Sequence, residues 1–137
     1  MEKLAQAVQL KTQLMSQGHP RFMLAETDLM TLGIHFYAPG IGENALHAHT
    51  KEDPIFMVLE GTAQFNTARD GKTILTASKN HAVVLPACCY YQFGNSGQTP
   101  LVMARSGTGS DKADQRLHLD GSAVSGRTQE PGAAKRC

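Results

Sequence analysis

Between residues 21 and 107 the chain consists of short runs that are either apolar throughout or apolar at every second position. Turn residues such as Pro39-Gly40 and Glu60-Gly61 separate these runs. A period of two between apolar and polar positions is typical of strands. Many short strands at this spacing, with no second helical pattern between them, predict an all-β sandwich or barrel. The nine expected strands are Phe22–Ala25, Leu29–Ala38, Ala45–His49, Ile55–Leu59, Ala63–Thr67, Thr73–Leu75, Ala82–Leu85, Tyr90–Phe93 and Leu101–Ala104.

The two ends of the chain follow other patterns. Within residues 1–20, apolar side chains recur near the three-to-four spacing of an amphipathic helix over 2–16, before the stop signal of Gly18 and Pro20. We expect an N-terminal α-helix that packs on the barrel or bridges two copies of the chain. Residues 108–137 are rich in Gly, Ser and charge, which predicts a flexible tail with one short strand near Arg116–Leu119. The barrel itself is expected to span 21–107.

Length and charge limit the classes of binding partner that we expect. The 137 residues suit one domain, and 13 basic against 12 acidic side chains give a formal net charge of +1. Nucleic acid and membrane are therefore not expected as partners, since both require a concentrated basic field. Three cysteines, of which Cys88 and Cys89 are adjacent, form no disulfide framework, and no signal peptide is evident. These features predict a cytoplasmic protein.

His47 and His49 are the first candidates for chemistry. Side chains two residues apart on a strand share a face, so both imidazoles can reach one metal ion at about 2.0–2.2 Å. An isolated pair of this kind is a weak signal, because chance pairs occur on solvated strand ends. The surrounding sequence strengthens it.

Two segments resemble the motifs of the cupin superfamily. The first is GENALHAHTKEDPIFMVLEG, with its histidine pair and closing glycine, and the second is NHAVVLPACCYYQFGN, with a proline and a final asparagine, Asn95. The resemblance covers about residues 30–106. It implies a double-stranded β-helix, the cupin jelly-roll barrel, with His47 and His49 as metal ligands. It also implies a small-molecule substrate and a homodimer.

The chain departs from the family pattern at two of the four ligand positions. Counting back from Gly61 places Pro54 where the family has glutamate, and proline has no donor atom. Counting on from Pro86 places Tyr91 where the family has histidine. Tyr91 is a candidate third ligand or general acid. The glycines of the second motif are also replaced, by Asn80 and Cys88.

Other side chains are expected to complete the pocket. Asp53 would turn inward if the strand were bulged, and Cys89 lies two residues before Tyr91. A thiolate at Cys89 would favour zinc, iron or copper, and a phenolate at Tyr91 needs a strong Lewis acid such as iron. The expected cofactor is a divalent transition metal: Fe, Mn, Zn, Ni or Cu. The pocket-lining candidates are His35, Asp53, Phe56, Cys89 and Phe93.

Three interpretations of the histidine pair remain open: a metal site with an altered ligand set, a metal-free pocket, or structural residues at a barrel mouth. Three functions follow. The first is a metal-dependent enzyme of the dioxygenase, lyase, isomerase or cyclase type. The second is a metal-free acid–base enzyme that uses Tyr91 and a histidine. The third is a binding module that senses a small molecule without turnover.

Overall fold

The computed structural model describes residues 2–10, 21–108, 114–120 and 122. Within these residues the chain forms ten strands: β1 (Arg21–Glu26), β2 (Met30–Tyr37), β3 (Gly42–His49), β4 (Asp53–Glu60), β5 (Thr62–Thr67), β6 (Thr73–Ser78), β7 (Ala82–Val84), β8 (Tyr91–Asn95), β9 (Leu101–Thr108) and β10 (Arg116–Leu117). The all-β prediction is confirmed. Each of the nine expected strands corresponds to one of β1 to β9, and β10 is the short strand expected near residue 116.

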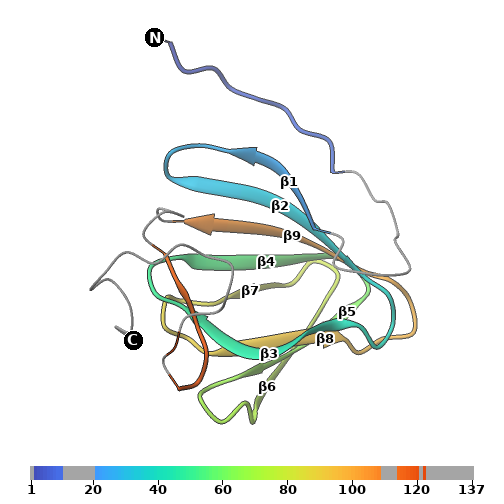
Figure 1. Ribbon diagram of the computed structural model, residues 1–137. Coiled ribbons are helices and arrows are strands. Elements are labelled where there is room, and N and C mark those ends of the chain that lie inside the picture. The colour runs from blue at the N-terminus through green and yellow to red at the C-terminus, as the bar shows by residue number, and fades with distance from the viewer. Residues whose placement is uncertain (1, 11–20, 109–113, 121, 123–137) are drawn as a thin grey trace.

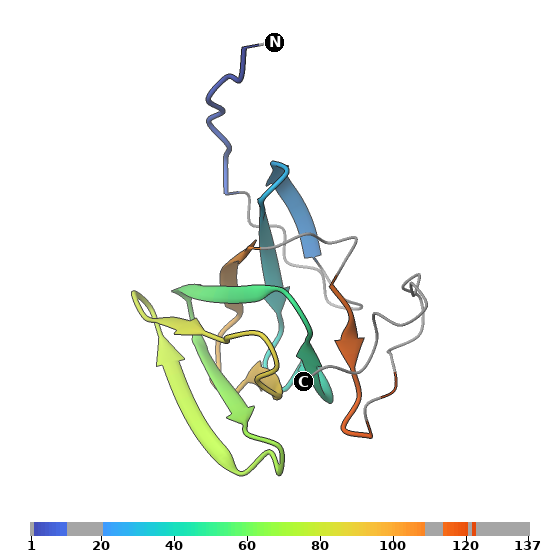
Figure 2. The same cartoon turned by 90° about the vertical axis from the view of Figure 1, so that its left-hand side faces the viewer.

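The strands form two antiparallel five-stranded sheets that face each other, as Figures 1 and 2 show. One sheet has the order β1-β2-β9-β4-β7 and the other β10-β3-β8-β5-β6. Neighbours such as β2 and β9 are far apart in sequence, so the chain crosses repeatedly between the two layers. This is the architecture of a double-stranded β-helix.

The core lies between the two sheets because the inward positions of the strands are apolar. Burial alternates with a period of two along β4, β5 and β8. The inward-facing positions of these three strands include Phe56, Phe65 and Phe93, whose ring centroids lie 5.1 to 5.6 Å apart. Each fully buried phenylalanine contributes about 1.5–3 kcal/mol relative to an exposed one. This packed cluster fills one part of the interior.

Residues with left-handed backbone angles form the turns between strands. Gly61 has φ of 84°, and a Cβ there would lie 2.5 Å from the Pro100 carbonyl oxygen, so only glycine fits. Asn80 and Cys88, which replace the glycines of the second motif, also have positive φ, 73° and 68°. The replacements therefore keep the backbone conformation that glycine would adopt, at some steric cost.

The expected N-terminal helix over 2–16 is not supported. Residues 2–10 form no helix and run away from the two sheets (Figure 1), with the Leu4 side chain 77% exposed. A helix of this length is marginal in water unless an apolar face packs on the protein, and these residues have no such contact surface. Residues 11–16 lie outside the described part. Nowhere in the described residues is there a helix able to cross a membrane.

Candidate functional site

A cavity of about 300 Å³ lies between the two sheets. One sheet contributes side chains from β1, β2, β4 and β9, and the other from β3, β8 and β10. Apolar side chains such as Phe22, Met23 and Phe56 line part of it. Its titratable side chains are Arg21, His35, Glu43, His47, His49, Glu52, Tyr91, Arg105 and Arg116.

His47, His49 and Tyr91, the three residues with roles predicted from sequence, meet in this cavity. Both histidines project from β3 and are buried, with 1% and 4% of their surface exposed. The register of β3 and β8 places His47 opposite Tyr91, and their ring centroids are 4.4 Å apart. The shared face expected of an i, i+2 pair on a strand is therefore observed.

A chain of hydrogen bonds links Asp114, His49 and Tyr91. Nδ1 of His49 lies 2.8 Å from Oδ2 of Asp114, and Nε2 lies 3.2 Å from the Tyr91 hydroxyl. A carboxylate accepts only, so Nδ1 of neutral His49 carries the proton and Nε2 accepts from Tyr91. The Nε2 atom of His49 therefore faces the Tyr91 hydroxyl, in the cavity.

Asp114 is fixed by a second set of contacts. Its Oδ1 accepts from the backbone N–H groups of Lys51 and Glu52, at 2.8 and 3.0 Å. Burial works to raise the pKa of Asp114, but the hydrogen bonds from His49 and from these N–H groups outweigh it and lower the pKa. Asp114 is therefore an ionised carboxylate in the neutral pH range.

Tyr91 is a proton donor in this arrangement. Burial is the main cause that raises the pKa of Tyr91 above its ordinary value, and Arg105 opposes it only in part. The side chain therefore stays a neutral phenol near pH 7. This favours the general-acid role predicted for Tyr91 over the phenolate-ligand role.

His47 has different partners from His49. Its Nδ1 lies 2.9 Å from the Ala45 carbonyl oxygen and its Nε2 lies 3.1 Å from a guanidinium nitrogen of Arg116. Nδ1 therefore carries the proton, and Nε2 accepts from Arg116. Burial, with the nearby Arg116 charge, lowers the pKa of His47 to about 4, so the ring is neutral at pH 7. The two Nε2 atoms of the pair are engaged by different groups.

Glu52, and not the residue at position 54, brings a carboxylate from this segment into the cavity. Pro54 is buried in β4 and does not line the cavity, whereas Glu52, the residue directly before β4, does. Its Oε1 pairs with Arg105 from β9 and lies 3.7 Å from Nδ1 of His49. Burial works to lower the pKa of Arg105, but the hydrogen bond and charge of Glu52 outweigh it and raise the pKa.

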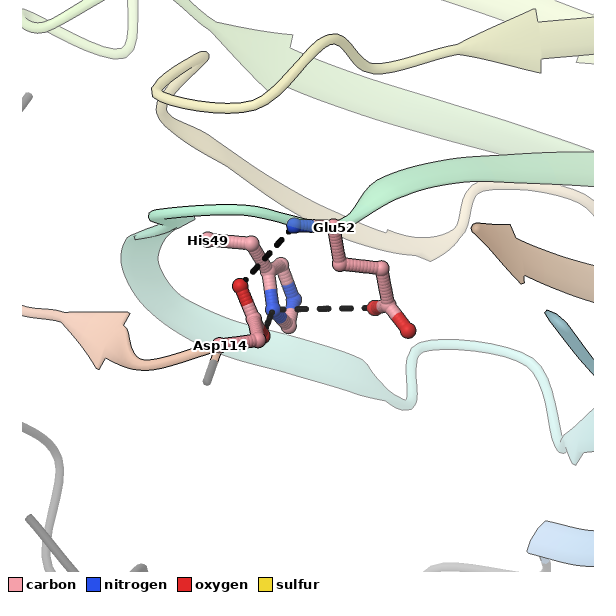
Figure 3. A group of neighbouring side chains, drawn as sticks. All are labelled: His49, Glu52 and Asp114. Carbon is pink, nitrogen blue, oxygen red and sulfur yellow. Dashed lines mark hydrogen bonds and ion pairs between the residues drawn. The ribbon is translucent and has the colours of Figure 1, made fainter. Parts of the chain in front are cut away.

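Three buried side chains around one point can hold a metal ion. The potential ligand atoms of His49, Glu52 and Asp114 lie within 4.8 Å of one another. Figure 3 shows the carboxylates of Glu52 and Asp114 both directed toward Nδ1 of His49. One imidazole and two carboxylates suit several divalent metals, so the donor set leaves the metal open. His47, a predicted ligand, is outside this group.

The five predicted pocket-lining residues divide into two groups. His35 and Phe56 line the cavity. His35 is neutral at pH 7, because burial and then the charges of Arg105 and Arg21 lower its pKa to about 3. Asp53, Cys89 and Phe93 do not line the cavity.

Each of these three side chains is drawn elsewhere by a specific contact. Asp53 is exposed and accepts from the Ala87 backbone N–H at 2.7 Å. Cys89 is a half-buried free thiol that packs on the core, since the turn at Cys88 breaks the strand alternation assumed for it. Phe93 shares the inward face of Tyr91 but belongs to the packed phenylalanine cluster.

Several site residues carried no sequence signal. Asp114 and Arg116 lie in the Gly- and Ser-rich segment expected to be a tail, and β10 brings them to β3 by pairing Arg116 with His49. Glu52 belongs to a charged run that is usually a solvated loop. Arg105 lies in β9, where every second side chain faces the interior. Only its place among those inward-facing positions could have indicated it from sequence.

Structural comparison finds similar folds at low sequence identity. A double-stranded β-helix protein from Klebsiella pneumoniae gives a TM-score of 0.66 at 15% identity, over 73% of this chain and 80% of that one. An RmlC-like cupin protein from Desulfovibrio desulfuricans gives 0.63 at 15%, over 78% and 97%. The cupin domain of Cnp3 from Schizosaccharomyces pombe gives 0.60 at 15%, over 70% of each chain. The sequence matches no protein-family model and no curated protein.

Proposed function

We propose that this protein, whose fold is the double-stranded β-helix of the cupin superfamily, is an enzyme that moves a proton on a small organic molecule. The observation that carries the proposal is the buried Asp114–His49–Tyr91 chain of hydrogen bonds, which ends in a cavity. A base and an acid held side by side by a third group are the elements of general acid–base catalysis. Fold alone does not fix the reaction, whereas these three side chains supply the base, the acid and the group that orients the base.

Each residue has one role. Nε2 of His49 takes a proton from a carbon next to a carbonyl group of the substrate. The Tyr91 hydroxyl turns from His49 to the carbonyl oxygen and donates a hydrogen bond where negative charge develops. Return of the proton from His49 to the same carbon regenerates the carbonyl compound, which is seen as exchange with solvent. In a β,γ-unsaturated carbonyl compound, return of the proton to the γ carbon moves the C=C bond next to the carbonyl and completes an isomerisation. Asp114 is a positioning residue, because it fixes the tautomer and the ring of His49 without touching the substrate.

The test is proton exchange with solvent. A panel of small carbonyl acids (pyruvate, 2-oxobutyrate and levulinate) is incubated with the enzyme in D₂O, and loss of C–H signals is followed by NMR. We expect exchange above the buffer rate, reduced by about 10²- to 10⁴-fold in His49→Gln and in Tyr91→Phe. His118→Gln, an exposed histidine outside the cavity, is the matched control. Equal exchange in wild type, both site variants and buffer would reject the proposal.

A second candidate function is a metal-dependent enzyme, favoured by the grouping of His49, Glu52 and Asp114. A bound divalent metal would supply Lewis-acid polarisation of a substrate oxygen. Two observations weigh against it. Arg105 pairs with Glu52, and Oδ2 of Asp114 lies 2.8 Å from Nδ1 of His49, in hydrogen-bond contact. Both contacts would have to be broken before these carboxylate oxygens could bind a cation.

Metal analysis separates the two candidates. Protein purified without an affinity tag is measured for metal content, and exchange is measured after dialysis against a strong chelator. The acid–base proposal predicts exchange that survives the chelator. The metal candidate predicts one metal per chain, lost in Glu52→Gln, and an activity that returns only when metal is restored.

A further inference from the structure

The cavity has more positive than negative charge. Arg21, Arg105 and Arg116 line it, against two glutamates, Glu43 and Glu52. The cavity histidines with resolved shifts, His35 and His47, have lowered pKa values of about 3 and about 4, so neither adds a charge at pH 7. Three arginines minus two glutamates leave one positive charge in excess among the lining groups.

The excess belongs to the pair Arg21 and Arg116. Glu52 is in direct contact with Arg105, so its negative charge balances the positive charge of that arginine. Glu43 is shared between the other two, with its carboxylate oxygens 3.3 Å from Arg21 and 3.6 Å from Arg116. A charge-assisted hydrogen bond between such groups spans about 2.7–2.9 Å, so Glu43 engages both guanidinium groups loosely.

Arg116 also has an unused donor. Its Nε is buried and has no hydrogen-bond partner among the described residues. A buried N–H without a partner costs free energy, which a bound acceptor oxygen would recover. The guanidinium fork presents its donors in the geometry of a carboxylate or phosphate.

The Arg21–Arg116 pair lies next to the acid–base residues. Arg116 is 3.1 Å from Nε2 of His47, and the His47 ring is 4.4 Å from the Tyr91 ring and 5.4 Å from the His49 ring. A ligand held by the arginines therefore extends over His47 toward Tyr91 and His49. The apolar side chains Phe22 and Phe56 line the same space.

We propose that the substrate is a small organic anion, a carboxylate or a phosphate ester, whose charged group binds to Arg21 and Arg116 on the cavity side of Glu43. This inference rests on the proposed function, since it places the reacting carbon at His49 and Tyr91. The cavity volume is at the low end for ligand sites, so the anion is small.

The test is binding, which needs no turnover. The probes are inorganic phosphate, benzoate and phenyl phosphate, with benzamide as the uncharged counterpart of benzoate, measured by titration calorimetry at low salt. We expect at least one anion to bind, benzoate to bind about 10-fold or more tightly than benzamide, and affinity to fall as salt rises. Benzoate against phenyl phosphate decides between a carboxylate and a phosphate.

Arg116→Gln and Arg21→Gln should each weaken anion binding by about 10- to 100-fold, the loss of one hydrogen bond to a charged group. Arg69→Gln, an arginine outside the cavity that covers the Tyr90 ring, should leave it unchanged. Melting curves establish that each variant is folded. If Arg116→Gln does not fold, Arg21→Gln still tests the site, because the Arg21 side chain is the more exposed of the two. Absence of anion binding to wild type, or affinities unaffected by both variants, would overturn the inference.

The two proposals fail separately. His49→Gln and Tyr91→Phe should still bind the anions, because neither removes an arginine. Anion binding without proton exchange in wild type would reject acid–base catalysis and leave the anion site. Exchange of an uncharged carbonyl compound with no anion binding would reject the anion site alone.

Discussion

The carboxylate of Asp114 lies 2.8 Å from Nδ1 of His49, although 65 residues separate the two in sequence. Strand β10 makes this contact possible by pairing with the end of β3, and the Gln115 backbone N–H donates a hydrogen bond to the Thr50 hydroxyl oxygen at 2.9 Å. The short segment 114–117 is therefore part of the site, because it delivers both a carboxylate and the Arg116 guanidinium.

Asp114→Asn should invert the tautomer of His49. The side-chain carbonyl oxygen of the new Asn would still accept from the backbone N–H groups of Lys51 and Glu52, so its NH₂ group would face Nδ1. Because the NH₂ group is a donor, Nδ1 would have to accept, and the ring proton would move to Nε2. The base would then be blocked, and proton exchange should fall by about 10⁴-fold, as in the same change in serine proteases. Nitrogen-15 NMR of the imidazole reads the tautomer directly. Asp70→Asn, an exposed carboxylate that accepts a backbone N–H, should change neither quantity; an Nδ1–H signal retained in Asp114→Asn would contradict the assignment.

Asn95→Ala should destabilise the barrel. Asn95 matches the family asparagine and is buried, and its side chain donates to the carbonyl oxygens of Tyr37 and Thr99 and accepts from the Gly97 N–H. Truncation leaves these backbone groups without partners, at a cost of about 2–4 kcal/mol in the free energy of unfolding. Denaturant unfolding measures it. Gln98→Ala, exposed on the same loop, should stay within about 0.5 kcal/mol of wild type.

Gly107→Ala should disturb Glu52 and its pair with Arg105. Gly107 lies in β9 opposite Pro54, and an added Cβ would overlap the Glu52 carboxylate. We expect a loss of about 1–3 kcal/mol, the usual cost of forcing extra volume into a packed site. The same change in a Glu52→Ala background should cost less, since the overlapping group is gone. Gly97→Ala, where the nearest atoms are at an ordinary 3.6 Å, is the control; equal costs in both backgrounds would show that Glu52 is not the obstacle.

Stability should fall as pH drops below about 6.5. The folded pKa values of His35 and His47 are about 3 and about 4, below the unfolded value of about 6.5. Between these values the unfolded chain binds more protons, so the free energy of unfolding is highest above pH 6.5 and decreases toward pH 4. Each histidine contributes up to about 1.4 kcal/mol per pH unit.

Urea unfolding between pH 7 and pH 4.5 measures this slope. Replacing one buried histidine, as in His35→Gln, should reduce the slope, whereas exposed His118→Gln should keep it. A wild-type stability that is flat across this range would contradict neutral, buried imidazoles.

The sequence by itself determined the barrel and the first two members of its site. Period-two alternation specifies strands because each strand buries one face, so all nine expected strands are found from local pattern alone. His47 and His49 follow from the same rule, and Tyr91 follows from its position in the second motif. The helix expected near the N-terminus lacked this support, since a short amphipathic pattern forms a helix only where something covers its apolar face.

Tertiary structure decided what the histidine pair does. The partners of His49 are Glu52 directly before β4, Tyr91 in β8 and Asp114 just before β10. No local pattern relates Glu52 or Asp114 to His49. Likewise the charge balance of the cavity depends on Arg21, Arg105 and Arg116, which three separate strands bring together. Proton position, charge and exposure are set by neighbours in space, so the role of His49 becomes visible only once the sheets have brought Asp114 to one ring nitrogen and Tyr91 to the other.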